Sequence, residues 1–362
     1  MELFALDLGN KQTKIKSSKK IKVLPSRFVE ASKYGNRELL SFAKTEQKDI
    51  RDFESNRDSG YTYVWGAELD EDTARPIDTI GFGKERYMKR EFKLLVDFAL
   101  AELALDFPQA QNSILEVAVV TGVPTSDYTQ NETLNALEKA IKGDHNVIVD
   151  GKSLNIRVKT LFVLPQPTGT ILNNIADDKG QLLDNPIINA SVGVVDIGGG
   201  TLLIDLFKKM NMDTENREQL PLGVYTLYKS IENELKSKGY EINTYEIENC
   251  VRFGNNNEKY YWSPDQVQTI DITDIVMKQR EKFTREVATE VKTAYKDFKR
   301  MQTILITGGG ANLLIKETFS NEIGIGIEQY IENSEFANVL GFYKYGLMEG
   351  IEETNEQQEQ TI

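Results

Sequence analysis

Short apolar runs alternate along the chain with segments in which apolar residues recur every three or four positions. The runs predict buried strands, among them FALDL (residues 4–8), LEVAVVTGVP (115–124), RVKTLFVL (157–164), SVGVVDI (191–197) and TILIT (303–307). Segments with one apolar face predict helices at residues 92–107, 171–176, 224–235 and about 275–298. Strands that alternate with amphipathic helices predict an α/β fold.

Two of the predicted strands end in an aspartate that is followed by a glycine-containing turn. In VVDIGGGTLLIDLF (194–207), three glycines join two apolar strands, and the first of them lies two residues after Asp196. A hairpin needs only one or two residues with positive φ, and further glycines let the backbone approach another molecule. LDLGNKQTKIK (6–16) repeats this arrangement around Asp7, and TILIT leads into a third turn, GGGANLL.

These turns predict a phosphate site. Exposed turn amides can hold phosphate oxygens, and the strand-ending carboxylates can hold Mg²⁺ through its waters. A single glycine-rich hairpin is equally compatible with a purely structural turn, but two hairpins and a third glycine-rich turn favour a metal–triphosphate complex. The Walker pattern is absent, because no glycine-rich turn is followed by Lys-Ser or Lys-Thr.

Composition narrows the classes of protein that fit. The 362 residues suffice for two domains, and the net charge of −13 argues against direct binding to DNA or to acidic membranes. No apolar run reaches the roughly 18 residues of a membrane span, and the N-terminus lacks the basic region of a signal peptide. The single cysteine, Cys250, fits a reducing compartment, so we expect a cytoplasmic protein.

The single histidine, His145, lies in the polar stretch KGDHNV and is predicted to be at the surface. With one histidine in the chain, a histidine-based zinc site or a Ser-His-Asp triad is not expected.

Five segments resemble, in order, the nucleotide-site segments of the actin superfamily: LDLGNKQTKIK, LPQPTGT, VVDIGGGTLLID, LITGGGANLL and FANVLGFYKYG. VLPSRF and VVTGVPTSDY look closest to the ParM/StbA-like bacterial actins, which segregate plasmids. The resemblance extends from residue 4 to residue 347. It implies an actin-like α/β fold of two ribonuclease-H-like domains, each with a smaller inserted subdomain, and a nucleotide cleft between them.

The resemblance also implies domain limits. Domain I is expected at residues 1–167, completed by 336–352, with an inserted subdomain at about 25–88. Domain II is expected at 168–335, with an inserted subdomain at about 211–301. Residues 353–362 form an acidic tail that is predicted to be disordered. Region 31–90 is rich in polar residues, and because its part 33–71 does not map onto known members, its role stays open.

Site residues are carried over from the matching positions. Asp7 and Asp196 would face Mg²⁺, mainly through water. Lys14 would reach the β- and γ-phosphates, where its charge offsets that of the triphosphate. The remaining phosphate-loop residues would be Gly9, Asn10 and Lys11 in the first hairpin and Gly198, Gly199, Gly200 and Thr201 in the second. Lys11 departs from the relatives, which commonly have Gly, Thr or Ser at that position.

Other matching residues would act on water and on the nucleoside. Gln166 would hold the attacking water, although a helix-capping role is the alternative; a glutamine orients water but is a poor base, which fits slow hydrolysis. Lys229 and Glu232 would contact the base or ribose. The turn against the adenosine would contain Gly308, Gly309, Gly310 and Asn312.

The implied protein is an ATPase that polymerises head to tail and segregates plasmid DNA through a small DNA-binding adaptor, without contacting DNA or membrane itself. GTP is the alternative nucleotide. Other members remain alternatives: a small-molecule kinase, for which no further catalytic Asp motif is evident, and a cell-shape or phage-encoded filament. A chaperone ATPase is not expected, because only a short Glu/Gln-rich tail follows the final predicted helix.

Overall fold

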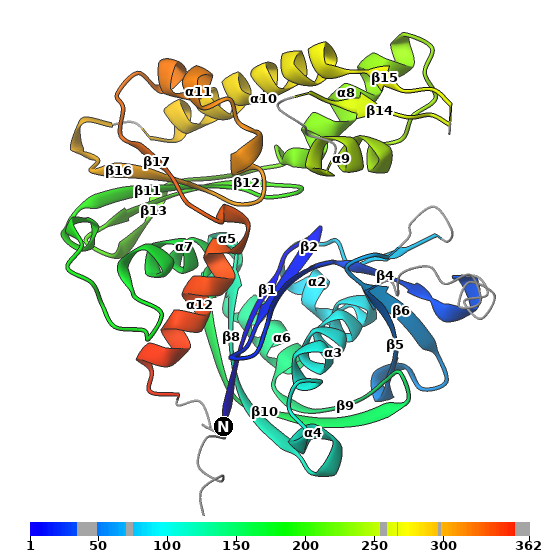
Figure 1. Ribbon diagram of the computed structural model, residues 1–362. Helices are drawn as coiled ribbons and strands as arrows, with labels where there is room; N and C mark the ends of the chain where they lie inside the picture. The colour runs from blue at the N-terminus through cyan, green and yellow to red at the C-terminus, as the bar shows by residue number, and fades with distance from the viewer. Residues whose placement is uncertain (35–48, 70–74, 254–258, 266, 296–297, 352–362) are drawn as a thin grey trace, which may run out of the picture. The chain divides into compact units, whose positions relative to one another are not determined.

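A computed structural model describes residues 1–34, 49–69, 75–253, 259–265, 267–295 and 298–351. The chain forms two compact units, unit 1 from Met1–Asp184 with Asn338–Ile362 and unit 2 from Asn185–Ala337 (Figure 1). The sequence places the first division near residue 168. It falls after Asp184, because helix α7 (Gln166–Ile175) packs against strands of unit 1. The tail expected at residues 353–362 lies outside the described residues.

Unit 1 is built on a ten-stranded sheet in the order β3-β2-β1-β8-β10-β9-β5-β6-β4-β7. The strands are β1 (Glu2–Leu8), β2 (Gln12–Lys16), β3 (Ile21–Pro25), β4 (Arg27–Glu30), β5 (Ile50–Ser55), β6 (Thr62–Gly66), β7 (Ile77–Asp78), β8 (Leu115–Val123), β9 (Gly143–Val149) and β10 (Lys152–Pro165). Strands β1, β8 and β10 are parallel, whereas β2 is antiparallel to both β1 and β3. Every residue of β1 is buried, as its apolar sequence predicts.

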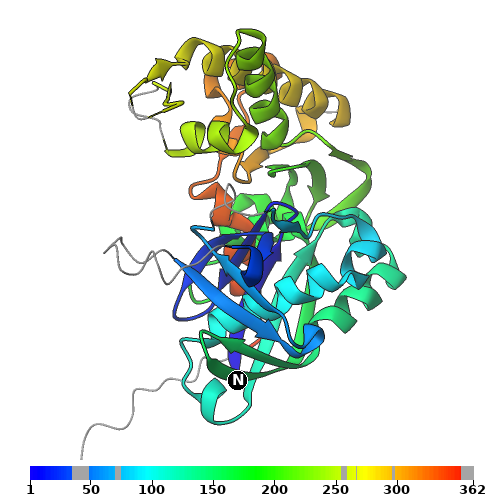
Figure 2. The ribbon, with the colours of Figure 1, turned by 90° about the vertical axis from the view of Figure 1, so that its right-hand side faces the viewer.

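The sheet of unit 1 curls around helix α3 (Arg90–Ala104) (Figures 1 and 2). The face predicted to be apolar is fully buried, from Phe92 to Leu103. Beside α7, the other helices are α2 (Gly83–Met88), α4 (Gln109–Asn112), α5 (Thr125–Tyr128), α6 (Asn131–Ile141) and α12 (Ala337–Met348), with 3-10 turns η1 (Ala31–Lys33) and η2 (Asn56–Asp58).

The region expected as an inserted subdomain at 25–88 continues the sheet of unit 1, because β5 pairs with β9 and β6 joins β5 to β4. Phe98 of α3 lies against four aromatic rings of these strands, at centroid separations between 4.9 and 6.1 Å: Phe28, Phe53, Tyr63 and Trp65. Aromatic pairs at such separations are stabilising. These strands therefore share one core with the rest of unit 1.

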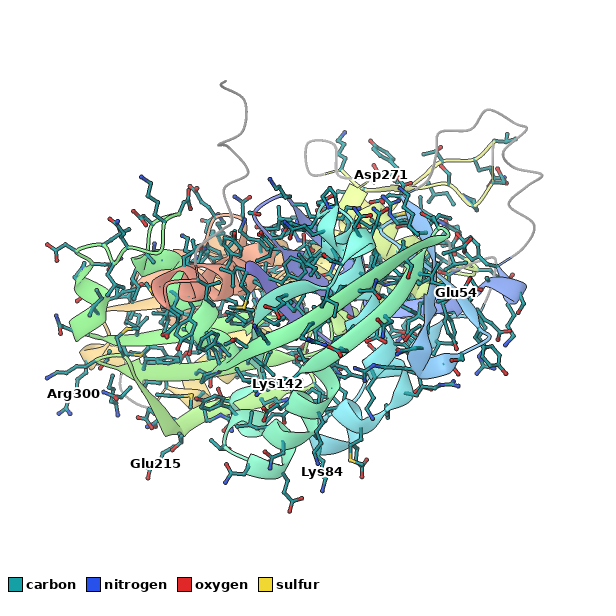
Figure 3. All side chains as sticks on the ribbon, turned by 90° about the horizontal axis from the view of Figure 1, so that it is seen from below. Glu54, Lys84, Lys142, Glu215, Asp271 and Arg300 are labelled. Atoms are coloured by element: carbon teal, nitrogen blue, oxygen red, sulfur yellow. The ribbon has the colours of Figure 1, made fainter. Side chains whose placement is uncertain are left out.

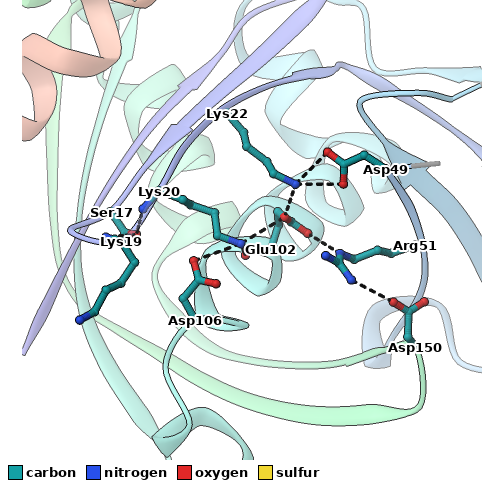
Figure 4. A network of polar contacts seen from close by, with 9 residues as sticks. All are labelled: Ser17, Lys19, Lys20, Lys22, Asp49, Arg51, Glu102, Asp106 and Asp150. Atoms are coloured by element: carbon teal, nitrogen blue, oxygen red, sulfur yellow. Dashed lines mark hydrogen bonds and ion pairs between the residues drawn. The ribbon is translucent and has the colours of Figure 1, made fainter. Parts of the chain in front are cut away.

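A network of ion pairs ties β3 and β5 to α3 (Figure 4). The Glu102 side chain is 3% exposed, and its carboxylate is paired with Lys20, Lys22 and Arg51 at 3.3, 2.9 and 3.3 Å. A buried carboxylate is stable only where cations compensate for its lost hydration. Glu102 thus holds β3, its preceding turn and β5 against the helix.

Unit 2 has a five-stranded sheet in the order β13-β12-β11-β16-β17. The strands are β11 (Ser191–Ile197), β12 (Leu202–Lys208), β13 (Asn211–Leu220), β16 (Thr303–Thr307) and β17 (Glu328–Tyr330). β11, β16 and β17 are parallel, and β12 is antiparallel to β11 and to β13. This order and these directions repeat β3-β2-β1-β8-β10 of unit 1, which confirms the predicted pair of ribonuclease-H-like α/β domains.

Four helices and a small two-stranded sheet complete the regular structure described in unit 2. These are α8 (Val224–Ser237), α9 (Thr244–Phe253), α10 (Thr273–Ala294) and α11 (Lys316–Ile323), with β14 (Tyr261–Trp262) and β15 (Ile270–Asp271). The 3-10 turns are η3 (Pro186–Asn189), η4 (Phe298–Arg300), η5 (Ala311–Leu313) and η6 (Ser334–Phe336).

The helix predicted at about 275–298 ends earlier than expected. Tyr295 leaves the helical conformation, at φ −94° and ψ 95°. Its hydroxyl donates to the carbonyl of Asp205 on β12 at 2.7 Å, and its side chain is buried. α10 therefore ends at Ala294, and the residue that follows it is fixed against the sheet of unit 2.

The surface prediction for His145 is wrong. His145 lies on β9 and is 0% exposed, with Nδ1 2.7 Å from Asp97 Oδ1 and Nε2 2.7 Å from the carbonyl oxygen of Ile141. Asp97 is also contacted by Arg57 Nε, at 3.0 Å. His145 is therefore a hydrogen-bonded core residue that joins β9 to α3 and α6.

Charged side chains lie on the exterior, among them Glu54, Lys84, Lys142, Glu215, Asp271 and Arg300 (Figure 3). Within the described residues, every helix is too short or too polar to cross a membrane.

Candidate functional site

The first candidate loop joins β1 to β2 in unit 1. Asp7 and Lys14 are direct partners in the antiparallel register, and Lys14 Nζ lies 3.5 Å from Asp7 Oδ2. The side chains are 5% and 13% exposed, so this pair is largely withdrawn from solvent. Gly9 makes a tight approach within the turn, because a Cβ on it would lie 2.7 Å from the carbonyl oxygen of Gln12.

Residues from the following segments hold this loop in place. Ser26 Oγ donates to the Gly9 carbonyl at 2.6 Å, and Arg86 donates to the same oxygen at 2.9 Å. The backbone N–H of Gly81 donates to Asn10 Oδ1 at 3.1 Å. The Asn10 side chain is thus engaged in supporting the loop. Sequence reasoning missed Ser26, Gly81 and Arg86, since nothing local links them to residues 9–11.

Gln166 follows the end of β10 and is the first residue of α7. Thr121 of β8 pairs with Leu6 of β1 and with Val163 of β10, so Gln166 lies two residues beyond the level of Asp7. Neighbouring strands are about 4.8 Å apart, which places the two backbones roughly 10 Å apart across the sheet. Asp7 and Gln166 therefore lie at the same carboxyl edge, where α/β sheets bind ligands.

Helix α7 is held firmly against α12. A Cβ on Gly341 would collide with the Gly169 carbonyl, so the two helix backbones are in direct contact. Thr170 Oγ1 donates to Asn338 Oδ1 at 2.8 Å. Lys344 Nζ donates to the Ala176 carbonyl at 2.8 Å, where a cation also suits the C-terminal end of the helix. These contacts fix the helix that begins with Gln166.

The second candidate loop joins β11 to β12 in unit 2. Gly198 N–H donates to the Thr201 carbonyl at 2.8 Å and closes the turn. The first amides of α8, from Val224 and Tyr225, donate to the carbonyls of Gly198 and Gly199 at 3.0 and 2.8 Å. A Cβ on Gly200 would meet no atom within 4 Å, so this side of the turn is open. The turn is thus anchored to the start of α8, and Gly200 has open space around its Cα.

The turn after β16 lies directly against the second loop. Asp196 pairs with Thr307 in the parallel register, and Gly310 N–H donates to the Ile197 carbonyl at 2.9 Å. Gly308 has φ +85°, and a Cβ on it would collide with Asp196 Oδ1. Gly308 is therefore required both by its backbone conformation and by the aspartate beside it. Asn312, on η5, is exposed.

The structure places Lys229 and Glu232 together on α8. The Glu232 side chain is 3% exposed and accepts hydrogen bonds from Lys229 at 3.0 Å, from Lys236 at 2.6 Å and from the Thr244 hydroxyl. Burial opposes ionisation of Glu232, but these donors outweigh it and lower its pKa to about 2. The Lys229 side chain is about half exposed, so of the two it is the one open to a ligand.

Each unit thus contributes a strand-ending aspartate to a glycine-containing turn. In unit 1, Asp7 lies with Lys14 and the loop at residues 9–11; in unit 2, Asp196 lies with the loop at 198–201 and the turn at 308–310. Carboxylate oxygens suit Mg²⁺, which commonly keeps several waters and binds only one or two carboxylates. Among the described residues, no group of three or more His, Cys, Asp or Glu side chains is arranged to hold a metal by itself.

Two family models match the chain. One describes the N-terminal domain of actin-like proteins and matches residues 5–169; the other describes the Alp7A C-terminal domain and matches residues 191–338. No curated protein matches the chain in sequence.

Solved structures also share its fold. The apo pSK41 ParM protein is 24% identical, with 96% of this chain and 98% of that chain covered and a TM-score of 0.73. The archaeal actin homologue Ta0583 in complex with ADP is 17% identical, with coverages of 96% and 99% and a TM-score of 0.74. A 15-stranded ParM filament from Clostridium botulinum is 20% identical, with coverages of 95% and 98% and a TM-score of 0.71. At these identities the likeness establishes the actin-like fold.

Proposed function

Because the chain belongs to the actin-like protein family, we propose that it is an ATPase whose assembly into filaments depends on the bound nucleotide. The archaeal relative binds ADP, and a ParM of the same fold forms filaments, which supports a nucleotide-binding and self-associating protein. GTP is the alternative nucleotide.

One observation supports this function most strongly. The two units share the same order of five strands, and each carries an aspartate at the penultimate position of its first strand, before a glycine-containing turn. Turn amides and helix N-termini favour anions, and carboxylates favour the metal that accompanies a triphosphate. We propose that Asp7 and Asp196 hold one Mg²⁺ mainly through water, and that the two loops hold the phosphates between them. Bound Mg²⁺ would neutralise charge on the phosphate oxygens.

The other site residues have separate proposed roles. Lys14 leaves Asp7 for the β- and γ-phosphates, and Gln166 orients the attacking water. The turn at 308–310 and Asn312 lie against the adenosine. Lys229, steadied by its ion pair with Glu232, contacts the base or ribose.

Assembly is proposed to be head to tail, because a heterologous interface that does not close produces a filament. We further propose that the filament acts in the cytoplasm and moves plasmid DNA through a small DNA-binding adaptor. The net charge of −13 argues against direct contact with DNA.

Sedimentation in the presence of Mg²⁺ with ATP, with ADP or without nucleotide tests this proposal. We expect pelleting with ATP, and its loss as phosphate is released. The Asp196→Ala variant should neither pellet nor release phosphate. The absence of nucleotide-dependent pelleting, together with transfer of phosphate to a small alcohol, would instead identify a kinase. Pull-down of a small basic protein encoded beside this gene tests the adaptor.

A further inference from the structure

Arg86, on the short helix α2, is a buried arginine close to the first candidate loop. It is 6% exposed, and its guanidinium carbon lies 5.0 Å from the centroid of the Phe92 ring. Gly81 gives it room, since a Cβ on Gly81 would lie 2.9 Å from Arg86 Cβ. The missing side chain at Gly81 thus leaves space for Arg86 in the interior of unit 1.

The guanidinium is held by neutral groups. One NH2 donates to the Gly9 carbonyl at 2.9 Å, and Nε donates to the Thr79 carbonyl at 3.2 Å. Among the described residues, no carboxylate lies within ion-pair distance of it. Burial lowers the pKa of Arg86, while the adjacent Tyr87 hydroxyl, through a hydrogen bond, and the more distant carboxylates of Asp127 and Asp7 act in the opposite direction. A buried charge without a paired counter-charge is costly, so an anion close to this site would be favoured.

The contact with Gly9 also sets the direction of a backbone amide. The Gly9 carbonyl accepts from both Arg86 and Ser26, which fixes its orientation toward these two side chains. In a trans peptide the C=O and the following N–H point in opposite directions. The N–H of Asn10 therefore points away from Arg86 and Ser26.

We propose that Arg86 is a positioning residue for the polyphosphate: it holds the Gly9–Asn10 peptide with its N–H pointing away from Arg86 and places a positive charge beneath the loop. This inference rests on the proposed function, and it adds a residue that lies far from the glycine-containing motifs. The bound phosphates supply the counter-charge that the protein itself does not provide at close range. The contribution of Arg86 therefore grows with the number of phosphates on the ligand.

Binding of adenosine, ADP and Mg²⁺–ATP to the full chain tests this proposal, measured by titration calorimetry. Arg86→Met removes the charge and keeps much of the apolar stem. We expect ATP affinity to fall on the order of tenfold or more, the scale of one charge-assisted contact, with a smaller loss for ADP and none for adenosine. Arg90→Met is the matched control, since the Arg90 side chain is 53% exposed and pairs with Asp58 and Glu91. It should bind all three ligands as the wild type does.

Two further outcomes keep the test decisive. An equal loss for all three ligands, or unchanged ATP binding by folded Arg86→Met, would overturn the inference and leave the proposed function intact. Failure of the wild type to bind any nucleotide would overturn both. If Arg86→Met does not fold, Arg86→Lys serves in its place: it keeps the charge but cannot reach both carbonyls. It should lose ATP affinity severalfold with adenosine unchanged, and unchanged ATP affinity would contradict the inference.

Discussion

Lys14 and Asp7 face each other across the β1–β2 hairpin, with Nζ 3.5 Å from Oδ2 and both side chains largely buried. In the proposed nucleotide complex the same two residues act on different partners, Lys14 on phosphate and Asp7 on the metal. Ligand binding would therefore replace the Lys14–Asp7 ion pair by a pair of Lys14 with phosphate and a pair of Asp7 with the metal. Before the ligand binds, the Lys14–Asp7 contact holds both side chains at the loop.

Replacement of Lys14 by methionine should weaken ATP binding on the order of tenfold to a hundredfold, because one charge-assisted phosphate contact is lost. Lys16→Met is the control, since Lys16 lies two residues farther along the same strand, above the Tyr343 ring. Titration with a fluorescent ATP analogue measures both variants. Equal affinities of Lys14→Met and wild type would exclude Lys14 from the phosphate site.

Gln166→Ala should slow ATP hydrolysis by roughly a hundredfold, the scale associated with misplacing a reacting group, while ATP binding changes little. Filaments should then persist longer after ATP is added. Phosphate release and light scattering, followed together, report both effects. Gln111→Ala, at an exposed position of α4, should match the wild type. Hydrolysis by Gln166→Ala at the wild-type rate would contradict a role of Gln166 in orienting water and would favour the alternative, a helix-capping role.

Gly308→Ala should destabilise unit 2, because the new methyl group collides with the Asp196 carboxylate and with the Ile197 carbonyl at a residue with φ +85°. We expect a loss of about 2–5 kcal/mol, from left-handed strain plus overpacking. Gly326→Ala is the matched control: Gly326 also has positive φ, but nothing lies within 4 Å of a Cβ there, so only the strain of about 1–2 kcal/mol applies. Urea denaturation compares the two. Similar losses would mean that the contacts with Asp196 and with the Ile197 backbone are easily relieved.

Because of Glu232, the free energy of unfolding of unit 2 should decrease as the pH falls through the acid range. Its pKa is lowered from 4.5 to about 2 in the folded chain. The ionised carboxylate therefore stabilises the fold fully above pH 4.5, and this contribution is lost as pH falls toward 2. The stability difference between wild type and Glu232→Gln should shrink over that interval. Glu281→Gln, at an exposed position of α10, should show a small difference throughout. A difference for Glu232→Gln that does not change with pH would argue against an ionised Glu232.

The parts of the fold that could be predicted from sequence are those with a strong local pattern. Strands β1 and β11 are mostly apolar and lead into a turn, so Asp7 and Asp196 could be placed near strand ends. The sequence does not predict strand β13, because none of its residues is buried and it lacks apolar alternation. It forms by pairing with β12, and such pairing between strands leaves no signal in the local sequence of β13.

Contacts between distant residues account for the remaining differences. His145 has polar neighbours in sequence, yet it is buried, where it forms a hydrogen bond with Asp97, 48 residues away. Arg86 supports a loop 77 residues away. The helix expected at 171–176 begins at Gln166, because a proline at its second position is compatible with a first helical turn. That shift matters for function, since it makes Gln166 part of a helix end.

A crystal structure with Mg²⁺ and a nonhydrolysable ATP analogue tests the central claim most directly. We predict one Mg²⁺ on the triphosphate with the carboxylates of both Asp7 and Asp196 within about 4–5 Å, a distance that one metal-bound water bridges. A nucleotide that contacts only one of the two glycine-containing turns, or that binds elsewhere, would contradict the account.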